Sequence, residues 1–160
     1  MSSLIIIGHV RDGVEIAHDY NLPEAVISIM SQHHGTTLVE YFYNEAKKLD
    51  DNVAEHNFRY RGPKPQTKEA AVLLLADSIE ASTRSLSDYS YSSIEDNVEK
   101  IIEKKHSEEK QLDESNITLT EIETIKKVFI KTLMSMYHTR IKYPDASKSS
   151  KEANDENSNQ

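Results

Sequence analysis

The sequence predicts an all-α fold, and three observations support this prediction. Apolar residues recur at helical spacing in several segments, no segment shows the apolar–polar alternation of a half-buried strand, and two Ser/Thr-x-x-Glu patterns precede apolar stretches. With 160 residues, the chain is long enough for one domain with a hydrophobic core. We therefore expect a bundle of about six helices.

The first two predicted helices lead to a pair of histidines. Residues 3–19 carry a helical apolar stripe, and Pro23 then suits the first turn of a second helix. The apolar face of this second helix continues directly into His33 and His34, and Gly35 is a good helix C-cap. Adjacent histidines at this point would need polar partners or a metal ion if they are buried.

The middle of the chain contains a short helix, a long loop and a very apolar helix. We expect the third helix from Leu38 to about Leu49, and a loop over residues 50–66, where Gly62 to Pro65 excludes regular structure. A loop of this length often serves as a lid or a binding loop. The fourth helix should begin after Thr67 as N-cap and reach about Leu86, and its nearly continuous apolar surface predicts a central position.

The last two predicted helices open with capping boxes. Ser92 with Glu95 precedes the fifth helix, residues 111–118 form a connector, and Thr120 with Glu123 precedes the sixth helix, which Pro144 ends. The predicted domain therefore covers residues 1–145. Residues 146–160 have no apolar cluster and are expected to be a disordered polar tail.

Composition excludes several classes of protein. A formal net charge of −8 argues against a protein that coats nucleic acid or binds an anionic membrane. It does not exclude a small anionic ligand, because a bound metal ion can reverse the local field. The absence of cysteine excludes disulfides, zinc–thiolate sites and cysteine nucleophiles. The apolar run Leu4–Ile7 is too short to span a membrane or to act as a signal peptide. We expect a cytoplasmic chain.

Four residues of metal-ligand type lie on or beside apolar helix faces, namely His9, His33, His34 and Asp77. Singly, each has an ordinary explanation, as a solvated or hydrogen-bonded side chain. Together, three imidazoles and one carboxylate suit Mn, Fe, Zn or Co, and do not suit Ca. Sequence spacing does not determine whether they converge.

Four motifs of this chain occur together in one known family. They are His9-Val10-x-Asp12-Gly13-Val14, His33-His34-Gly35-Thr36, the segment from Phe58 to Ala71, and Leu75-Ala76-Asp77-Ser78. With these motifs the chain resembles the seven-transmembrane HD-domain phosphodiesterases that hydrolyse cyclic di-AMP. The resemblance covers about residues 4–145, and a continuous Gly-Pro-Lys-Pro-Gln-Thr-Lys-Glu string makes it specific. The resemblance implies an HD-domain helical bundle of which this chain is the C-terminal two-thirds.

The resemblance also implies a site and a chemistry. In the family, two metal ions, usually Mn or Fe, activate a water molecule that attacks a phosphodiester. By position, His9, His33 and His34 resemble the ligands of one ion, and Asp77 resembles a ligand of the other. The substrate would be a cyclic dinucleotide. Three cations are candidate phosphate contacts on charge and position alone: Lys64, Lys68 and Arg84.

The family's domain begins with one further histidine and the His-Asp dyad whose aspartate bridges both metals. This chain lacks both, and His18-Asp19 falls where the family has ordinary surface residues, so we interpret it as a coincidence. His56, His106 and His138 are interpreted as loop or surface residues. We therefore expect one ion, with a second one weak, and little activity unless an upstream fragment supplies the missing helices and membrane segments.

Three alternatives remain open at this stage. The chain could be a regulatory remnant that binds metal or nucleotide without turnover. It could be a non-functional truncation with an exposed apolar surface where absent helices packed. It could also be an HD phosphohydrolase for another nucleotide, which the Gly62–Ala71 string makes the weaker choice of substrate class.

Overall fold

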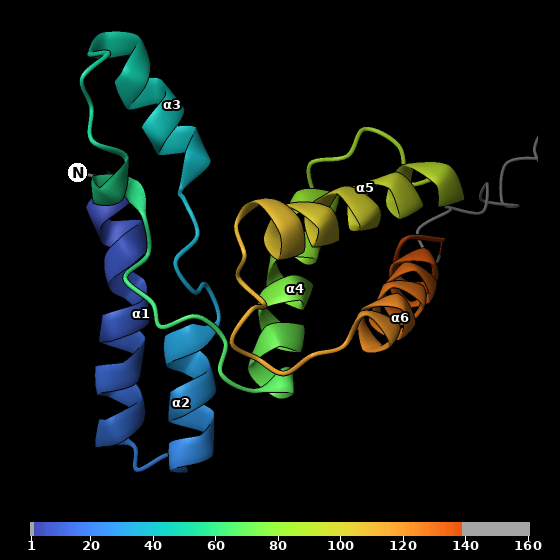
Figure 1. Ribbon diagram of the computed structural model, residues 1–160, viewed down its shortest axis with the longest axis horizontal. Helices are drawn as coiled ribbons and strands as arrows, with labels where there is room; N and C mark the ends of the chain where they lie inside the picture. The colour runs from blue at the N-terminus through green and yellow to red at the C-terminus, as the bar shows by residue number, and fades with distance from the viewer. Residues whose placement is uncertain (1, 139–160) are drawn as a thin grey trace, which may run out of the picture.

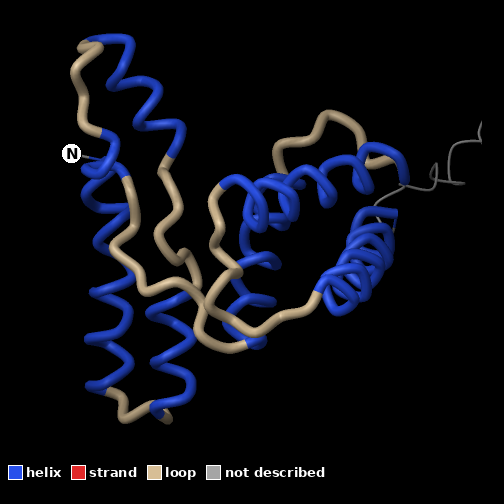
Figure 2. The backbone as a smooth tube through the Cα atoms, in the orientation of Figure 1, coloured by secondary structure: helices blue, strands red, loops and turns tan. Residues whose placement is uncertain are grey.

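A computed structural model describes residues 2–138 of the chain. It contains α-helices throughout these residues and no strand, so the predicted all-α fold is confirmed (Figures 1 and 2). The helical elements in order are α1 (Ser2–Asp19), α2 (Glu24–Gln32), α3 (Glu40–Leu49), η1 (Glu55–Phe58), α4 (Lys68–Thr83), α5 (Tyr91–Glu103), η2 (Lys104–Glu108) and α6 (Leu119–His138). The predicted tail and Pro144 lie outside the described residues.

Helix α4 occupies the centre of the molecule, as its apolar composition predicts. Helices α1 and α2 pack together on one side of it, and α5 with α6 lies on the other (Figure 1). The buried apolar residues of α4 are Ala70, Ala71, Leu74, Leu75 and Ile79. Burying each of the larger aliphatic side chains contributes about 1.5–3 kcal/mol, so α4 anchors both halves.

Both predicted capping boxes are two residues away from the true helix starts. Helix α5 is capped by Ser90, whose hydroxyl accepts from the Ser93 N–H, and not by Ser92. In α6, Thr118 and Glu121 form the reciprocal box, with Thr118 N–H donating to Glu121 at 2.8 Å. The prediction of Thr120 was wrong because the Thr-x-x-Glu pattern occurs twice in adjacent registers, and local pattern does not choose between them. Helix α4 also ends at Thr83, before the predicted Leu86.

The long segment after α3 is ordered by backbone pairing. It contains η1, and its next residues pair with the segment that precedes α3 in an isolated bridge between Leu38 and Arg59. The Val39 N–H donates to the Phe58 carbonyl at 2.8 Å, and the Tyr60 N–H donates to the Thr37 carbonyl at 3.0 Å. The predicted loop is therefore fixed against the residues that follow the histidine pair.

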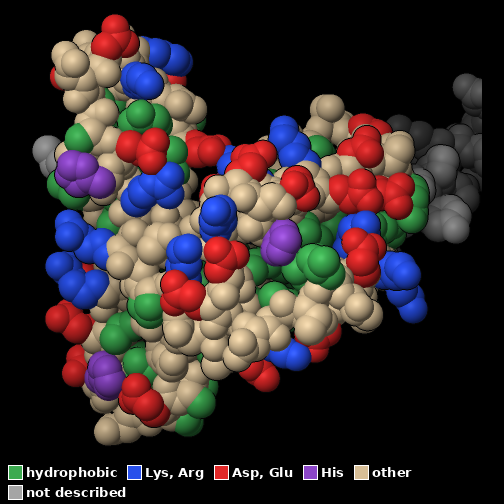
Figure 3. All heavy atoms as spheres, in the orientation of Figure 1, with side chains coloured by type: hydrophobic (Ala, Val, Ile, Leu, Met, Phe, Trp, Pro, Cys, Tyr) green, Lys and Arg blue, Asp and Glu red, His purple; other side chains and the backbone are tan. Residues whose placement is uncertain are grey.

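The surface carries charges of both signs. Acidic and basic side chains are mixed over the face seen in Figure 3, with hydrophobic side chains exposed between them. No helix within residues 2–138 has both the length and the apolar character required to cross a membrane.

Candidate metal centre

The Nε2 atoms of two histidines from different helices, His9 and His33, face one another. His9 belongs to α1, and His33 caps the C-terminus of α2. The Nδ1 of each ring is hydrogen-bonded to the carbonyl three residues earlier, to Ile6 for His9 and to Met30 at 2.6 Å for His33. An Nδ1–H that donates to a carbonyl leaves Nε2 with a free lone pair. The two Nε2 atoms lie 3.3 Å apart.

This spacing fits a shared metal ion. Two unprotonated nitrogens facing each other repel unless a proton or a cation lies between them. Two imidazole ligands on one ion, each bonded at roughly 2.0–2.1 Å, stand roughly 3.0–3.4 Å apart at tetrahedral or octahedral angles. The ligand atoms of His9, His33 and His34 all lie within 4.8 Å of one another. The donor set therefore fits a divalent transition-metal ion.

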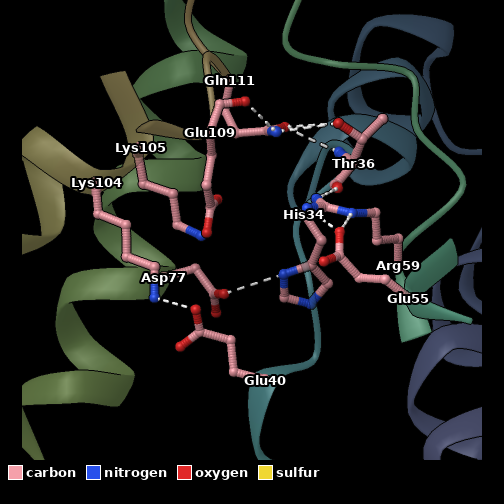
Figure 4. A network of polar contacts seen from close by, with 10 residues as sticks. All are labelled: His34, Thr36, Glu40, Glu55, Arg59, Asp77, Lys104, Lys105, Glu109 and Gln111. Atoms are coloured by element: carbon pink, nitrogen blue, oxygen red, sulfur yellow. Dashed lines mark hydrogen bonds and ion pairs between the residues drawn. The ribbon is translucent and has the colours of Figure 1, made fainter. Parts of the chain in front are cut away.

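His34 connects this histidine cluster to α4. Its Nδ1 lies 3.4 Å from Oδ2 of Asp77, whose side chain is 44% exposed (Figure 4). Burial, followed by the charges of His33, His9 and Lys105, lowers the pKa of His34 to about 3. His34 is consequently neutral at physiological pH, which is the state that binds metal. The structure thus brings together all four predicted ligands, and their roles as ligands, including the assignment of Asp77 to a second ion, stay predictions.

The turn after the histidine pair depends on Gly35. This residue has φ +53°, and a Cβ there would lie 2.3 Å from Oε1 of Gln111. The same oxygen accepts the Thr36 N–H at 2.9 Å, and Gln111 is 1% exposed. A residue far along the sequence therefore fixes the chain directly after His34.

Tyr60 covers the site from the long segment, and sequence reasoning gave it no role. Its ring stacks on the His34 ring with 4.2 Å between centroids and 26° between planes. Burial, followed by the charge of Asp77, raises the pKa of Tyr60 to about 12. The aromatic residue inside the Phe58–Ala71 string was the available signal, but its contact with His34 depends on folding.

Two hollows adjoin the cluster. The larger, of about 500 Å³, lies between the α1 face that bears Leu4 and Ile7 and the residues His34, Tyr60 and Arg61. The smaller, of about 270 Å³, is lined by His9, His33, Met30 and Leu73 among others. The ligand cluster is thus accessible from two sides.

The predicted phosphate contacts have protein partners of their own. Lys64 donates to the Lys110 carbonyl at 2.8 Å, Lys68 pairs with Glu121 at 2.6 Å, and Arg84 pairs with Glu80. None of these contacts joins them to the histidine cluster, and their role in binding stays a prediction. His18 and His56 are exposed and His106 is partly buried; none belongs to the cluster.

An all-helical domain that gathers three imidazoles and a carboxylate beside its central helix is a metal-binding domain of the HD class. The chain belongs to the HD domain family, whose sequence profile matches residues 3–82. It is 43% identical over 148 residues to the cyclic-di-AMP phosphodiesterase PgpH of Bacillus subtilis, covering 92% of this chain and 21% of that protein. It is also 43% identical over 141 residues to PgpH of Listeria monocytogenes, covering 88% of this chain and 20% of that protein.

The fold agrees with this relationship. The crystal structure of the L. monocytogenes PgpH HD domain in complex with cyclic-di-AMP matches with a TM-score of 0.81 and 42% identity, covering 85% of this chain and 63% of that one. The family resemblance inferred from the motifs is therefore confirmed. The chain spans about a fifth of the length of the curated relatives it matches.

Proposed function

We propose that this chain is part of a cytoplasmic metal-dependent phosphodiesterase domain that hydrolyses cyclic di-AMP to the linear dinucleotide. The observation that carries the proposal is the 3.3 Å separation of the His9 and His33 Nε2 atoms, with His34 and Asp77 beside them. Two relatives at 43% identity are cyclic-di-AMP phosphodiesterases, and a similar HD domain was crystallised with cyclic-di-AMP. These similarities support the choice of substrate.

The proposed cofactor is Mn or Fe, held by His9, His33 and His34, with Asp77 as a ligand of a weaker second ion. A bound ion of this kind lowers the pKa of a coordinated water and neutralises phosphate charge. The chain's own contribution is electrostatic and positional. Three neutral imidazoles add no negative charge, so with one carboxylate the centre keeps a net positive field for an anionic phosphodiester. Tyr60 keeps water from one face of His34.

We also propose that full activity requires ligands from outside these 160 residues. This chain covers 63% of the crystallised HD domain, so the remainder of that domain has no counterpart in these 160 residues. A further histidine and a bridging aspartate, expected from the family resemblance, would lie outside these 160 residues. Alone, the chain should bind one ion and hydrolyse the substrate weakly or not at all.

Calorimetry with Mn²⁺ and then with cyclic di-AMP, followed by chromatography of the products, tests the proposal. We expect Mn²⁺ and nucleotide binding by the chain alone. Hydrolysis should increase when the part of the L. monocytogenes HD domain that this chain does not cover is added. Failure to bind Mn²⁺ would contradict the proposed site. Binding without hydrolysis in the mixture would identify a regulatory module, and preferential hydrolysis of another nucleotide would change the substrate.

A further inference from the structure

A buried ion pair lies beside the metal centre and has no part in the proposed chemistry. Lys105 Nζ is 2.8 Å from Oε2 of Glu109, and the two side chains are only 11% and 10% exposed. Removing two charges from water is costly, and such pairs are often no more stabilising than apolar residues of the same volume. Stability alone therefore does not account for a lysine at this position.

The backbone around Lys105 is irregular and tied to the histidine turn. Lys105 lies in η2, a π-helical turn in which the Glu109 N–H donates to the Lys104 carbonyl at 2.9 Å. Turns of this type occur often at functional sites. The side chain of Gln111, which follows, holds Thr36, and Lys104 pairs with Glu40. Both flanks of Lys105 are thus anchored to the segment after His34.

The ammonium group faces the ligand cluster. In Figure 4, the side chains of Lys105 and Glu109 extend from their segment toward Asp77 and His34. Lys105 therefore lies next to the ligand cluster. By contrast, the described contacts of Lys64, Lys68 and Arg84, the cations proposed from the sequence, are with residues outside the ligand cluster.

We propose that Lys105 is an anion-contact residue of the metal centre, and that a phosphate oxygen of the ligand replaces or shares its contact with Glu109. A lysine ammonium has three donors, so one can stay on Glu109 while another reaches the anion. In the absence of the anion, Glu109 neutralises the buried cation. The ligand class is a phosphate mono- or diester beside a bound divalent ion; that this ester is cyclic di-AMP rests on the proposed function.

If Lys105 has this role, replacing Lys105 and replacing Glu109 should change phosphate affinity in opposite directions. Lys105→Met removes the donor with little change in volume and should weaken phosphate binding about tenfold or more, because charged hydrogen bonds are the strong ones. Glu109→Gln removes the competing carboxylate and should tighten phosphate binding by about threefold. A purely structural pair would give weaker binding in both variants. Lys126→Met is the matched control, because Lys126 also pairs with carboxylates, Glu99 of α5 and Glu123 of α6, and neither belongs to the ligand cluster.

The experiment is a calorimetric titration of the Mn²⁺-loaded chain with inorganic phosphate and, separately, with cyclic di-AMP. The double variant Lys105→Met/Glu109→Gln, which leaves no buried charge unpaired, replaces Lys105→Met if that variant fails to fold. Weaker phosphate binding with Mn²⁺ affinity unchanged within about threefold supports the inference.

Three results would overturn the role of Lys105, and a fourth would contradict only the proposed substrate. The role is overturned if phosphate affinity is unchanged in the lysine variants, or if the unmodified chain does not bind phosphate. It is also overturned if the lysine variants lose Mn²⁺ binding, since Lys105 would then maintain the metal site itself. Lys105-dependent phosphate binding without any cyclic di-AMP binding supports the inference and contradicts the proposed substrate.

Discussion

The Nε2 atoms of His9 and His33 lie 3.3 Å apart although 24 positions separate the two residues. Packing of α1 on α2 sets this distance, and a backbone carbonyl of the same helix orients each ring. The pair is therefore built on two helices, and each ring is oriented by its own helix. Orientation of ligands by backbone hydrogen bonds favours a defined coordination geometry over an adaptable one.

Removing either histidine of this pair should abolish tight metal binding. We expect His9→Ala and His33→Ala each to weaken Mn²⁺ binding by about a hundredfold, since even the outer partners of metal ligands are worth about 10- to 100-fold. Calorimetry at pH 7.5 measures the change. The control is His56→Ala, because His56 is exposed on η1. Equal losses in all three variants would place the metal elsewhere.

The metal-free chain should lose stability in mildly acidic solution because of His34. The folded state holds its pKa near 3, whereas the unfolded chain titrates near 6.5, so the unfolded state takes up the extra proton as pH falls. This contribution is fully present above pH 6.5 and is lost between pH 6.5 and about 3, by at most about 1.4 kcal/mol per pH unit.

Urea unfolding in EDTA at pH 8, 6 and 5 tests this dependence. The free energy of unfolding of the unmodified chain should fall more steeply toward pH 5 than that of His34→Gln, which cannot take up the proton. Parallel pH profiles for the two proteins would show that His34 is protonated equally in the folded and unfolded states.

Gly35→Ala should destabilise the fold by about 1–3 kcal/mol, because a β-carbon at φ +53° is strained and would collide with Gln111. Gly8→Ala is the matched control. The nearest atom to a Cβ at Gly8 is Asp12 Oδ2 at 3.8 Å, and alanine is about 1 kcal/mol better than glycine inside a helix. Thermal unfolding should therefore move in opposite directions for the two variants.

Helical periodicity was sufficient for the helices, for the central place of α4 and for placing His9, His33, His34 and Asp77 on or beside apolar helix faces. That these faces meet follows from helix packing, which periodicity did not predict. Periodicity was also insufficient for the residues that support them. Gln111 contacts Thr36 across 75 positions, and Tyr60 reaches His34 through a loop with no periodic pattern. Such contacts arise from tertiary packing, so a local pattern does not predict them.

The register of α6 provides a direct test of the capping assignment. Thr118→Ala should cost about 1 kcal/mol, because the Thr118 hydroxyl accepts from the Glu121 N–H at the helix start. Thr120→Ala should cost less than about 0.5 kcal/mol, as Thr120 is exposed and its side chain caps nothing. Urea unfolding of both variants measures the difference. A larger loss for Thr120→Ala would restore the start predicted from sequence.

The stacked ring of Tyr60 should be what keeps His34 neutral. Burial is the first cause of the low pKa of His34, and Tyr60 covers the ring at 4.2 Å. Tyr60→Ala admits water to this face and should raise the pKa of His34 by about one unit or more, as expected when desolvation is relieved. Tyr60→Phe retains the stacked ring and should leave the pKa unchanged. NMR titration of the His34 ring in metal-free protein distinguishes the two. If Tyr60→Ala also left the pKa unchanged, burial by other residues and the neighbouring charges of His33, His9 and Lys105 would be what holds His34 neutral.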